Sequence, residues 1–137
     1  MKVKLFAAAL LAVALSGCSD AKQDKDAIHG EWAVVSAENG GKAISAGAVA
    51  QSWVTFAGDK FVFCYEGNVN AATFTLDAAK SPKQINLKDE NGRLRLAIYE
   101  LTGDDLKICL DESGKDRPSS FATSGGRNGM MVLKRKK

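Results

Sequence analysis

The sequence predicts an all-β fold, a single antiparallel lipocalin- or calycin-like barrel of about eight or nine strands with at most one short helix. Apolar and polar residues alternate along most of residues 28–137, and this period of two is typical of half-buried strands. Turn residues interrupt the alternation about every eight to twelve positions, a spacing typical of sandwiches and barrels. A sheet that closes on itself leaves no open edge, so we favour a barrel.

Turn signals divide the domain into short strands, and Asn91-Gly92 is a strong one because this dipeptide favours tight hairpins. Residues 42–52 lack strand alternation and are expected to contain the short helix. The expected strands are residues 30–37, 53–58, 60–67, 72–78, 84–90, 93–103, 106–112, 120–124 and 130–135.

The alternation also predicts which side chains face the barrel interior. The expected inward residues are Phe61, Phe63, Tyr65, Phe74, Leu76, Ile85, Leu87, Leu94, Leu96, Ile98, Leu106, Ile108 and Leu110. The expected outward residues are Glu66, Thr73, Lys88, Arg95, Lys107 and Asp111. An eight-stranded barrel is either filled by its own side chains or holds one small ligand. The short chain favours the filled or nearly filled barrel; in a hollow one, Trp53, Phe63, Tyr65, Phe74 and Leu96 are the expected ligand contacts.

The N-terminus predicts export and a lipid anchor. Residues 1–17 combine Lys2 and Lys4 with an apolar run and small residues, the layout of a signal peptide. Leu15-Ser16-Gly17-Cys18 resembles the bacterial lipobox, which implies cleavage before Cys18 and acylation of its thiol. Residues 18–27 are polar and are expected to form a tether to the domain at 28–137. The alternative is a secreted soluble protein with an unmodified Cys18.

The predicted localisation is the bacterial cell envelope. Two or more acyl chains hold a protein stably on a membrane, and the apolar run is too short to remain as a transmembrane helix. Ser19 follows the cysteine where aspartate favours inner-membrane retention in enterobacteria, so we expect the outer membrane, facing the periplasm.

Charge argues against a nucleic-acid partner. The whole chain has 19 basic and 16 acidic residues, and without Lys2 and Lys4 the mature chain carries a net charge of about +1. The basic end at residues 134–137 is expected to be solvated, with anionic headgroups as the alternative contact.

Gly30-Glu31-Trp32, at the start of the first strand, resembles the Gly-x-Trp motif of lipocalin and calycin barrels. In those barrels the tryptophan packs over the closed end and a cation from the last strand lies across it. The resemblance implies that Trp32 pairs with Arg135 or Lys134.

A wider resemblance covers nearly all of residues 28–135. The segments GEWAVVSAENGGK, VTFAGDKF, TFTLDAAKSPKQINL, IYELTGDDLKICL, DRPSSF and VLKR are similar to a small lipocalin-like domain of unknown function found in planctomycetes and other bacteria. Ala97 departs from this pattern where glycine is expected, and Cys64 is not part of it. Because that family has no established activity, the resemblance implies a fold and no catalytic residue.

The residues that carry enzyme chemistry are few. His29 is the only histidine, and it lies at the edge of the predicted domain. A single histidine at this position forms neither a histidine metal cluster nor a Ser-His-Asp triad in one chain. Adjacent carboxylates such as Asp104-Asp105 fall in turns and point to opposite faces, unlike a facing acid/base pair. We therefore expect no catalytic residues, no metal and no cofactor.

Cys64 and Cys109 remain as an even pair in an oxidising compartment, which favours a disulfide. Their predicted strands are well separated around the barrel, which opposes one, because bonded cysteines need Cα atoms within about 7 Å. Both outcomes stay open from sequence.

Two binding functions fit these observations better than an enzyme. The first is a non-enzymatic lipoprotein that binds a small apolar ligand or lipid in the barrel. The alternative is a protein-binding module, such as a periplasmic inhibitor or immunity protein, that uses the loops at residues 68–70 and 113–120. The oligomeric state is not predicted.

Overall fold

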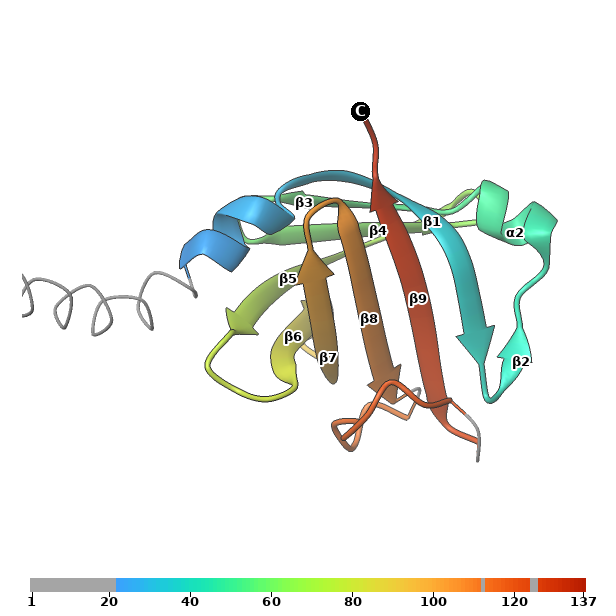
Figure 1. Cartoon of the computed structure of the whole chain (residues 1–137). Coiled ribbons are helices and arrows are strands. Elements are labelled where there is room, and N and C mark those ends of the chain that lie inside the picture. The colour runs from blue at the N-terminus through green and yellow to red at the C-terminus, as the bar shows by residue number, and fades with distance from the viewer. Residues whose placement is uncertain (1–21, 112, 124–125) are drawn as a thin grey trace, which may run out of the picture.

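The computed structural model describes residues 22–111, 113–123 and 126–137 of the chain (Figure 1). The predicted signal peptide and the predicted lipidation site at Cys18 lie outside the described residues.

The fold is a closed antiparallel barrel of eight strands with one extra short strand, as the sequence predicts. The strands lie in the sheet in the order β2-β1-β3-β4-β5-β6-β7-β8-β9, and pairing of β1 with β9 closes the barrel. β2 pairs only with the end of β1 among the described strands. The strands are β1 (Gly30–Asn39), β2 (Lys42–Ala43), β3 (Trp53–Ala57), β4 (Lys60–Tyr65), β5 (Asn68–Asp77), β6 (Lys83–Asp89), β7 (Leu94–Thr102), β8 (Asp105–Asp111) and β9 (Asn128–Arg135).

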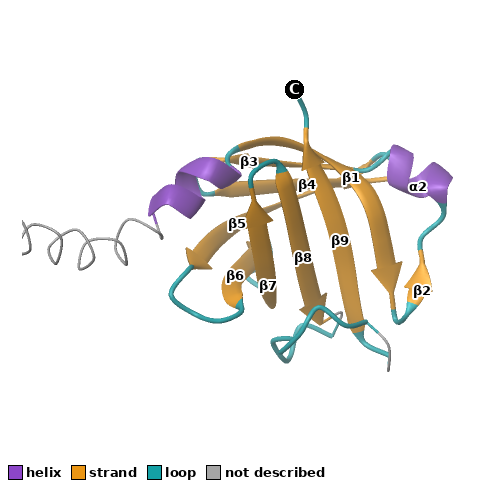
Figure 2. Ribbon diagram, viewed as in Figure 1, coloured by secondary structure: helices purple, strands orange, loops and turns teal. Residues whose placement is uncertain are grey.

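Two short helices lie at opposite ends of the barrel, where the sequence predicts at most one (Figures 1 and 2). Helix α2 (Ala46–Ala50) lies in the segment expected to be helical, and the Ser45 side chain caps it by accepting a hydrogen bond from the Ala48 amide at 3.3 Å. The additional helix covers residues 22–28, mostly within the segment expected to be a polar tether.

A β-bulge in β1 changes which of its side chains face inward. Trp32 and Val34 are buried in the core, and the pairing with β9 then shifts register between Val34 and Ser36. After the shift Ala37 packs against the core, while Val35 is 49% exposed. The bulge thus ends the simple alternation of this strand.

Strand β7 faces the opposite way from the prediction. Ile85 is fully buried in the core and pairs directly with Ala97, and directly paired residues share a face. Ala97, Tyr99 and Leu101 therefore face inward together with Arg95. The predicted inward positions Leu94, Leu96 and Ile98 face outward, so that part of the prediction is wrong.

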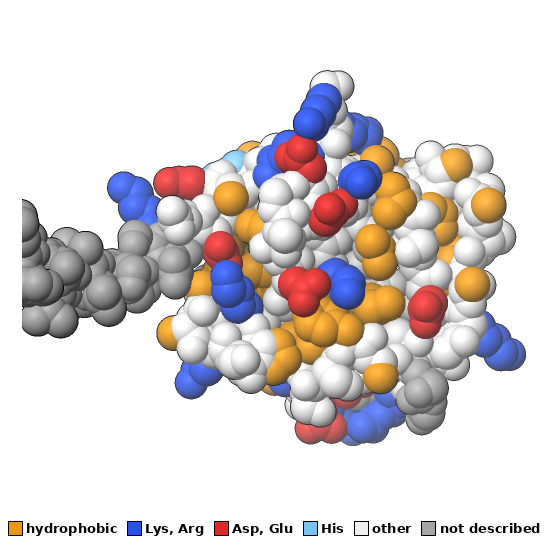
Figure 3. Space-filling model, in the orientation of Figure 1, with side chains coloured by type: hydrophobic (Ala, Val, Ile, Leu, Met, Phe, Trp, Pro, Cys, Tyr) orange, Lys and Arg blue, Asp and Glu red, His pale blue; other side chains and the backbone are white. Residues whose placement is uncertain are grey.

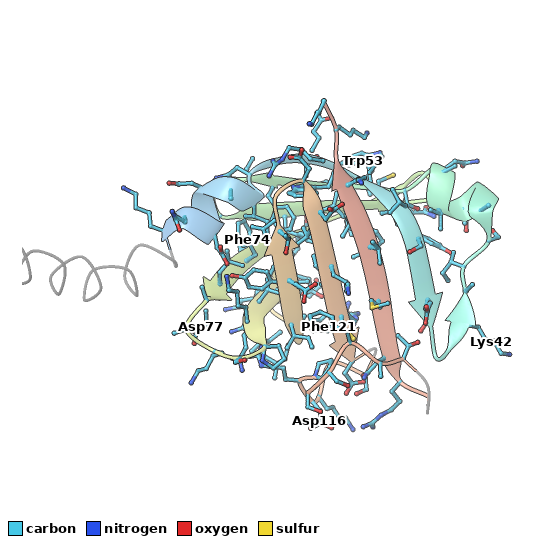
Figure 4. All side chains as sticks on the ribbon, in the orientation of Figure 1. Lys42, Trp53, Phe74, Asp77, Asp116 and Phe121 are labelled. Carbon is cyan, nitrogen blue, oxygen red and sulfur yellow. The ribbon has the colours of Figure 1, made fainter. Side chains whose placement is uncertain are left out.

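The connection between β8 and β9 lies against the outside of the barrel and explains the apolar outer face of β7. Figure 4 labels Phe121 at the lower part of β7 and β8, and the Lys107 ammonium lies 5.4 Å from its ring centroid. The connection shields Ile98 and Cys109, which are buried although they face outward. The strand expected at 120–124 is not formed at its described residues 120–123.

Candidate functional site

One end of the barrel is closed by Trp32. Its side chain is fully buried, and its ring nitrogen donates a hydrogen bond of 2.9 Å to the Ile28 carbonyl. The Arg135 guanidinium lies across the ring, 4.3 Å from the centroid. Of the two cations that the resemblance offered, Arg135 occupies this position. Because Arg135 also donates to the carbonyls of Ala27 and His29, the last strand holds the chain entering the first.

The helix at residues 22–28 is fixed to this closed end by a polar cluster. Asp24 accepts a hydrogen bond of 2.7 Å from the Tyr99 hydroxyl and forms an ion pair of 2.8 Å with Lys83. Burial, together with the Asp24 carboxylate, raises the pKa of Tyr99, which keeps the hydroxyl protonated as a donor. Ile28 adds a fully buried side chain. Residues 22–28 are therefore part of the barrel.

Aromatic side chains fill the barrel next to this end. Phe56 contacts Phe61 and Phe74 edge to face, with ring centroids 5.2 and 5.0 Å apart. This geometry is the preferred one for aromatic pairs. All three rings belong to the buried core, so side chains fill this half of the barrel.

The other half contains a cavity of about 490 Å³, so the barrel is only half filled. This volume is within the range of small-molecule sites. Aromatic rings continue from the core into it along β4, because Phe63 lies 6.5 Å from Phe61 and 6.3 Å from Tyr65. Apolar side chains lining the cavity are Val34, Ala37, Ile44, Val49, Phe61, Phe63, Ala71, Ala72, Leu87, Ile108, Leu110, Met130 and Met131.

Polar and charged groups also line this cavity. They are Glu38, Asn39, Ser52, Tyr65, Asn70, Asp89, Arg93 and Arg95. Asp89 forms an ion pair of 2.9 Å with Arg93 and accepts hydrogen bonds from the backbone amides of Asn91 and Arg93. These bonds, first that of the Arg93 amide, lower the pKa of Asp89. Burial and the neighbouring Glu66 raise the pKa of Tyr65, so its phenol stays neutral at physiological pH.

Only two of the five predicted ligand contacts line the cavity, Phe63 and Tyr65. Phe74 faces inward but belongs to the filled half. Trp53 lies on the outer face, because its neighbour Val54 is fully buried in the core and successive residues of a strand alternate. Leu96 faces outward, as do Leu94 and Ile98 on the same strand. Arg95 was expected on the outer face, and this prediction is wrong, because Arg95 pairs with the buried Leu87 and lines the cavity. Its alternation with Ala97 and Tyr99 is a visible signal for the inner face.

Cys64 and Cys109 are free thiols, and both are buried. They lie on β4 and β8, which are not neighbours in the sheet. Both thiols face outward, since Cys64 pairs with the outward-facing Trp53 and Cys109 with the outward-facing Ile98. Of the two opposing arguments, the separation of the strands agrees with the free thiols, and the even number of cysteines does not.

The loops considered for a protein partner differ in character. Val69 in the 68–70 segment is 60% exposed at the start of β5. In the 113–120 segment, Arg117 donates to the Ala97 carbonyl at 2.7 Å and to the Asn86 side chain at 2.6 Å. This second segment is therefore bound to the barrel wall. Figure 3 shows charges of both signs scattered among hydrophobic side chains on one face.

The single histidine lies far from the cavity, at the closed end. His29 makes a 2.9 Å hydrogen bond to the Gly58 carbonyl through its ring nitrogen. Within the described residues, no group of three or more His, Cys, Asp or Glu side chains could hold a metal ion.

No helix among the described residues is long and apolar enough to cross a membrane. The chain matches no protein-family model, no curated protein and no solved structure. The closed eight-stranded barrel itself is consistent with a lipocalin-like fold.

Proposed function

We propose that this protein is a non-enzymatic binding protein that holds a small apolar ligand in the open half of its barrel. The observation that carries this proposal is the cavity of about 490 Å³, which is lined along β4 by the aromatic rings of Phe61, Phe63 and Tyr65. Burial of an apolar ligand there is favourable by about 25 cal/mol for each Å² removed from water. A closed eight-stranded barrel with a buried aromatic cluster is compatible with such a role.

We also propose that the protein is a lipoprotein anchored through Cys18 to the outer membrane, facing the periplasm. The support is the signal-peptide layout followed by Leu15-Ser16-Gly17-Cys18. Asp24 is fixed at the closed end, and the six residues from Cys18 to Asp24 span at most about 20 Å. The anchor would then hold the closed end near the membrane, with the cavity at the opposite end accessible from the periplasm.

The anchor has a direct test in cells. We expect the wild-type chain to label with an alkyne fatty acid and to sediment with membranes. The variant Cys18→Ser should lose both properties, because the acceptor thiol is gone, while Cys64→Ser should keep them. Membrane sedimentation of Cys18→Ser without label would contradict the anchor.

Ligand binding is tested by filling the cavity. Ala72 lines it on β5, whereas the next residue, Thr73, is exposed on the outer face of the same strand. We expect Ala72→Phe to weaken binding of the neutral fluorophore N-phenyl-1-naphthylamine at least about tenfold, because the new ring occupies ligand space. Thr73→Phe adds a comparable ring outside and should leave the affinity unchanged.

Fluorescence titration of the mature chain carrying Cys18→Ser measures both affinities, and thermal melting checks that both variants fold. Equal loss in the two variants, or no binding by the wild type, would sink the cavity proposal. Native mass spectrometry of the acylated protein released from its membrane separates the two binding roles. A retained small molecule supports the proposal, and a retained protein supports the inhibitor-like alternative.

A further inference from the structure

Arg95 brings a permanent positive charge to an otherwise mostly apolar cavity. It lies on the inner face of β7, directly opposite the core residue Leu87, and lines the cavity. A guanidinium stays charged at every physiological pH. Arg95 is half-buried, and a cation that loses its water when a ligand enters needs an anion or several acceptors to replace that water.

The other charges near the cavity already have partners. The Asp89 carboxylate binds the Arg93 side chain at 2.9 Å and two backbone amides. Glu38 accepts a hydrogen bond of 2.7 Å from the Thr123 hydroxyl. By contrast, the Arg95 side chain makes no hydrogen bond or ion pair with another residue that the structure describes. Among the charged lining residues, Arg95 is the one whose side chain has no partner among the described residues.

The position of Arg95 fits one kind of ligand. Phe61 and Phe63 provide an apolar wall that extends from the packed core into the cavity, and Arg95 adds five N–H donors to the same space. A molecule that satisfies both needs an apolar body and an anionic group at one end. Hydrogen bonds between a guanidinium and a carboxylate or phosphate are stronger than neutral ones and are often bidentate.

We infer that the cavity selects a small amphiphile with an anionic head group, whose carboxylate or phosphate binds Arg95 while its apolar chain packs against Phe61 and Phe63. This inference rests on the proposed binding function and specifies its ligand class. The head group provides the acceptors that the described residues do not, and the chain occupies the apolar space.

The test compares ligands that share one chain and differ in the head group. Decanoate, decyl phosphate and decanol each compete with N-phenyl-1-naphthylamine for the mature chain carrying Cys18→Ser at pH 7.4 and low salt. We expect at least one of the two anions to bind about tenfold or more tightly than decanol. The two anionic arms distinguish a carboxylate from a phosphate head group.

Variants assign this preference to Arg95. Arg95→Met keeps an unbranched side chain without charge and should lose the preference for anions, measured as the ratio of the anion affinity to the decanol affinity within the same variant. Arg95→Lys should keep part of that preference. Lys88→Met removes one positive charge from the exposed outer face of β6 and should change nothing beyond a small salt-dependent effect.

The outcomes separate this inference from the function on which it rests. Failure of the neutral fluorophore to bind contradicts the binding function itself. Binding of fluorophore and decanol with no preference for either anion overturns the inference alone. A preference for anions that persists in Arg95→Met, or that disappears equally in Lys88→Met, overturns it as well. Melting curves confirm that each compared variant is folded, and Arg95→Lys supplies the comparison if Arg95→Met is not.

Discussion

Replacing Trp32 with alanine is expected to lower the free energy of unfolding by about 3–5 kcal/mol. Trp32 is fully buried, and its removal leaves a cavity between the packed core and the helix at residues 22–28. The change also removes the hydrogen bond to the Ile28 carbonyl and the surface on which Arg135 lies. Urea denaturation of the mature chain carrying Cys18→Ser, followed by far-ultraviolet circular dichroism, measures the loss.

The other tryptophan provides the matched control. Trp53 is half-buried on the outer face of β3, so Trp53→Ala should cost about 1–2 kcal/mol, since less surface leaves the core. Trp32→Phe should fall between the two, because it refills part of the space without the ring donor. A loss in Trp32→Ala no greater than in Trp53→Ala would show that Trp32 does not organise the closed end.

The sequence predicted the barrel because most strands carry a single apolar face. In β4 and β8, Phe61, Phe63, Leu106 and Ile108 face inward as expected. In β7 both alternating sets contain apolar residues, so period two alone leaves its phase undecided. The phase depends on the pairing of Ala97 with Ile85 and on the distant β8–β9 connection that covers the outer side. Neither is visible in local sequence.

The candidate site was harder to predict than the fold, because it depends on where along the barrel the filling ends. Phe74 and Phe63 both face inward, yet one belongs to the filled half and the other lines the cavity. The difference depends on how strands far apart in sequence align. Residues 22–27 are polar, so the sequence predicted a tether and not a helix attached to the barrel. They are attached through Asp24, which binds Tyr99 and Lys83. Partners so distant in sequence leave no local pattern.

The second large effect is expected at Arg117, which fastens the β8–β9 connection to the barrel wall. Its guanidinium donates to the carbonyls of Ala97 and Ile85 and to the Asn86 side chain. Arg117→Met keeps much of the side chain's apolar length and removes all three bonds. The free energy of unfolding should fall by about 1–3 kcal/mol, because buried acceptors lose a donor.

The reactivity of Cys109 shows whether Arg117→Met detaches the β8–β9 connection from the barrel. In the mature chain carrying Cys18→Ser and Cys64→Ala, Cys109 is the only remaining cysteine. Burial makes its thiol inaccessible and raises its pKa, so the wild-type connection should keep its reaction with Ellman's reagent slow. Opening of the connection exposes the sulfur and relieves the shift.

We therefore expect Arg117→Met to accelerate labelling of Cys109 at least about tenfold at pH 7.5, under conditions in which the barrel stays folded. Lys115→Met is the control, since Lys115 is exposed in the same connection and its side chain leaves the bonds to β6 and β7 intact. Equal acceleration in both variants would mean that the charge of the connection matters and not its attachment. No acceleration in Arg117→Met, despite lost stability, would place the cover of Cys109 in other contacts, such as that of Phe121 with Lys107.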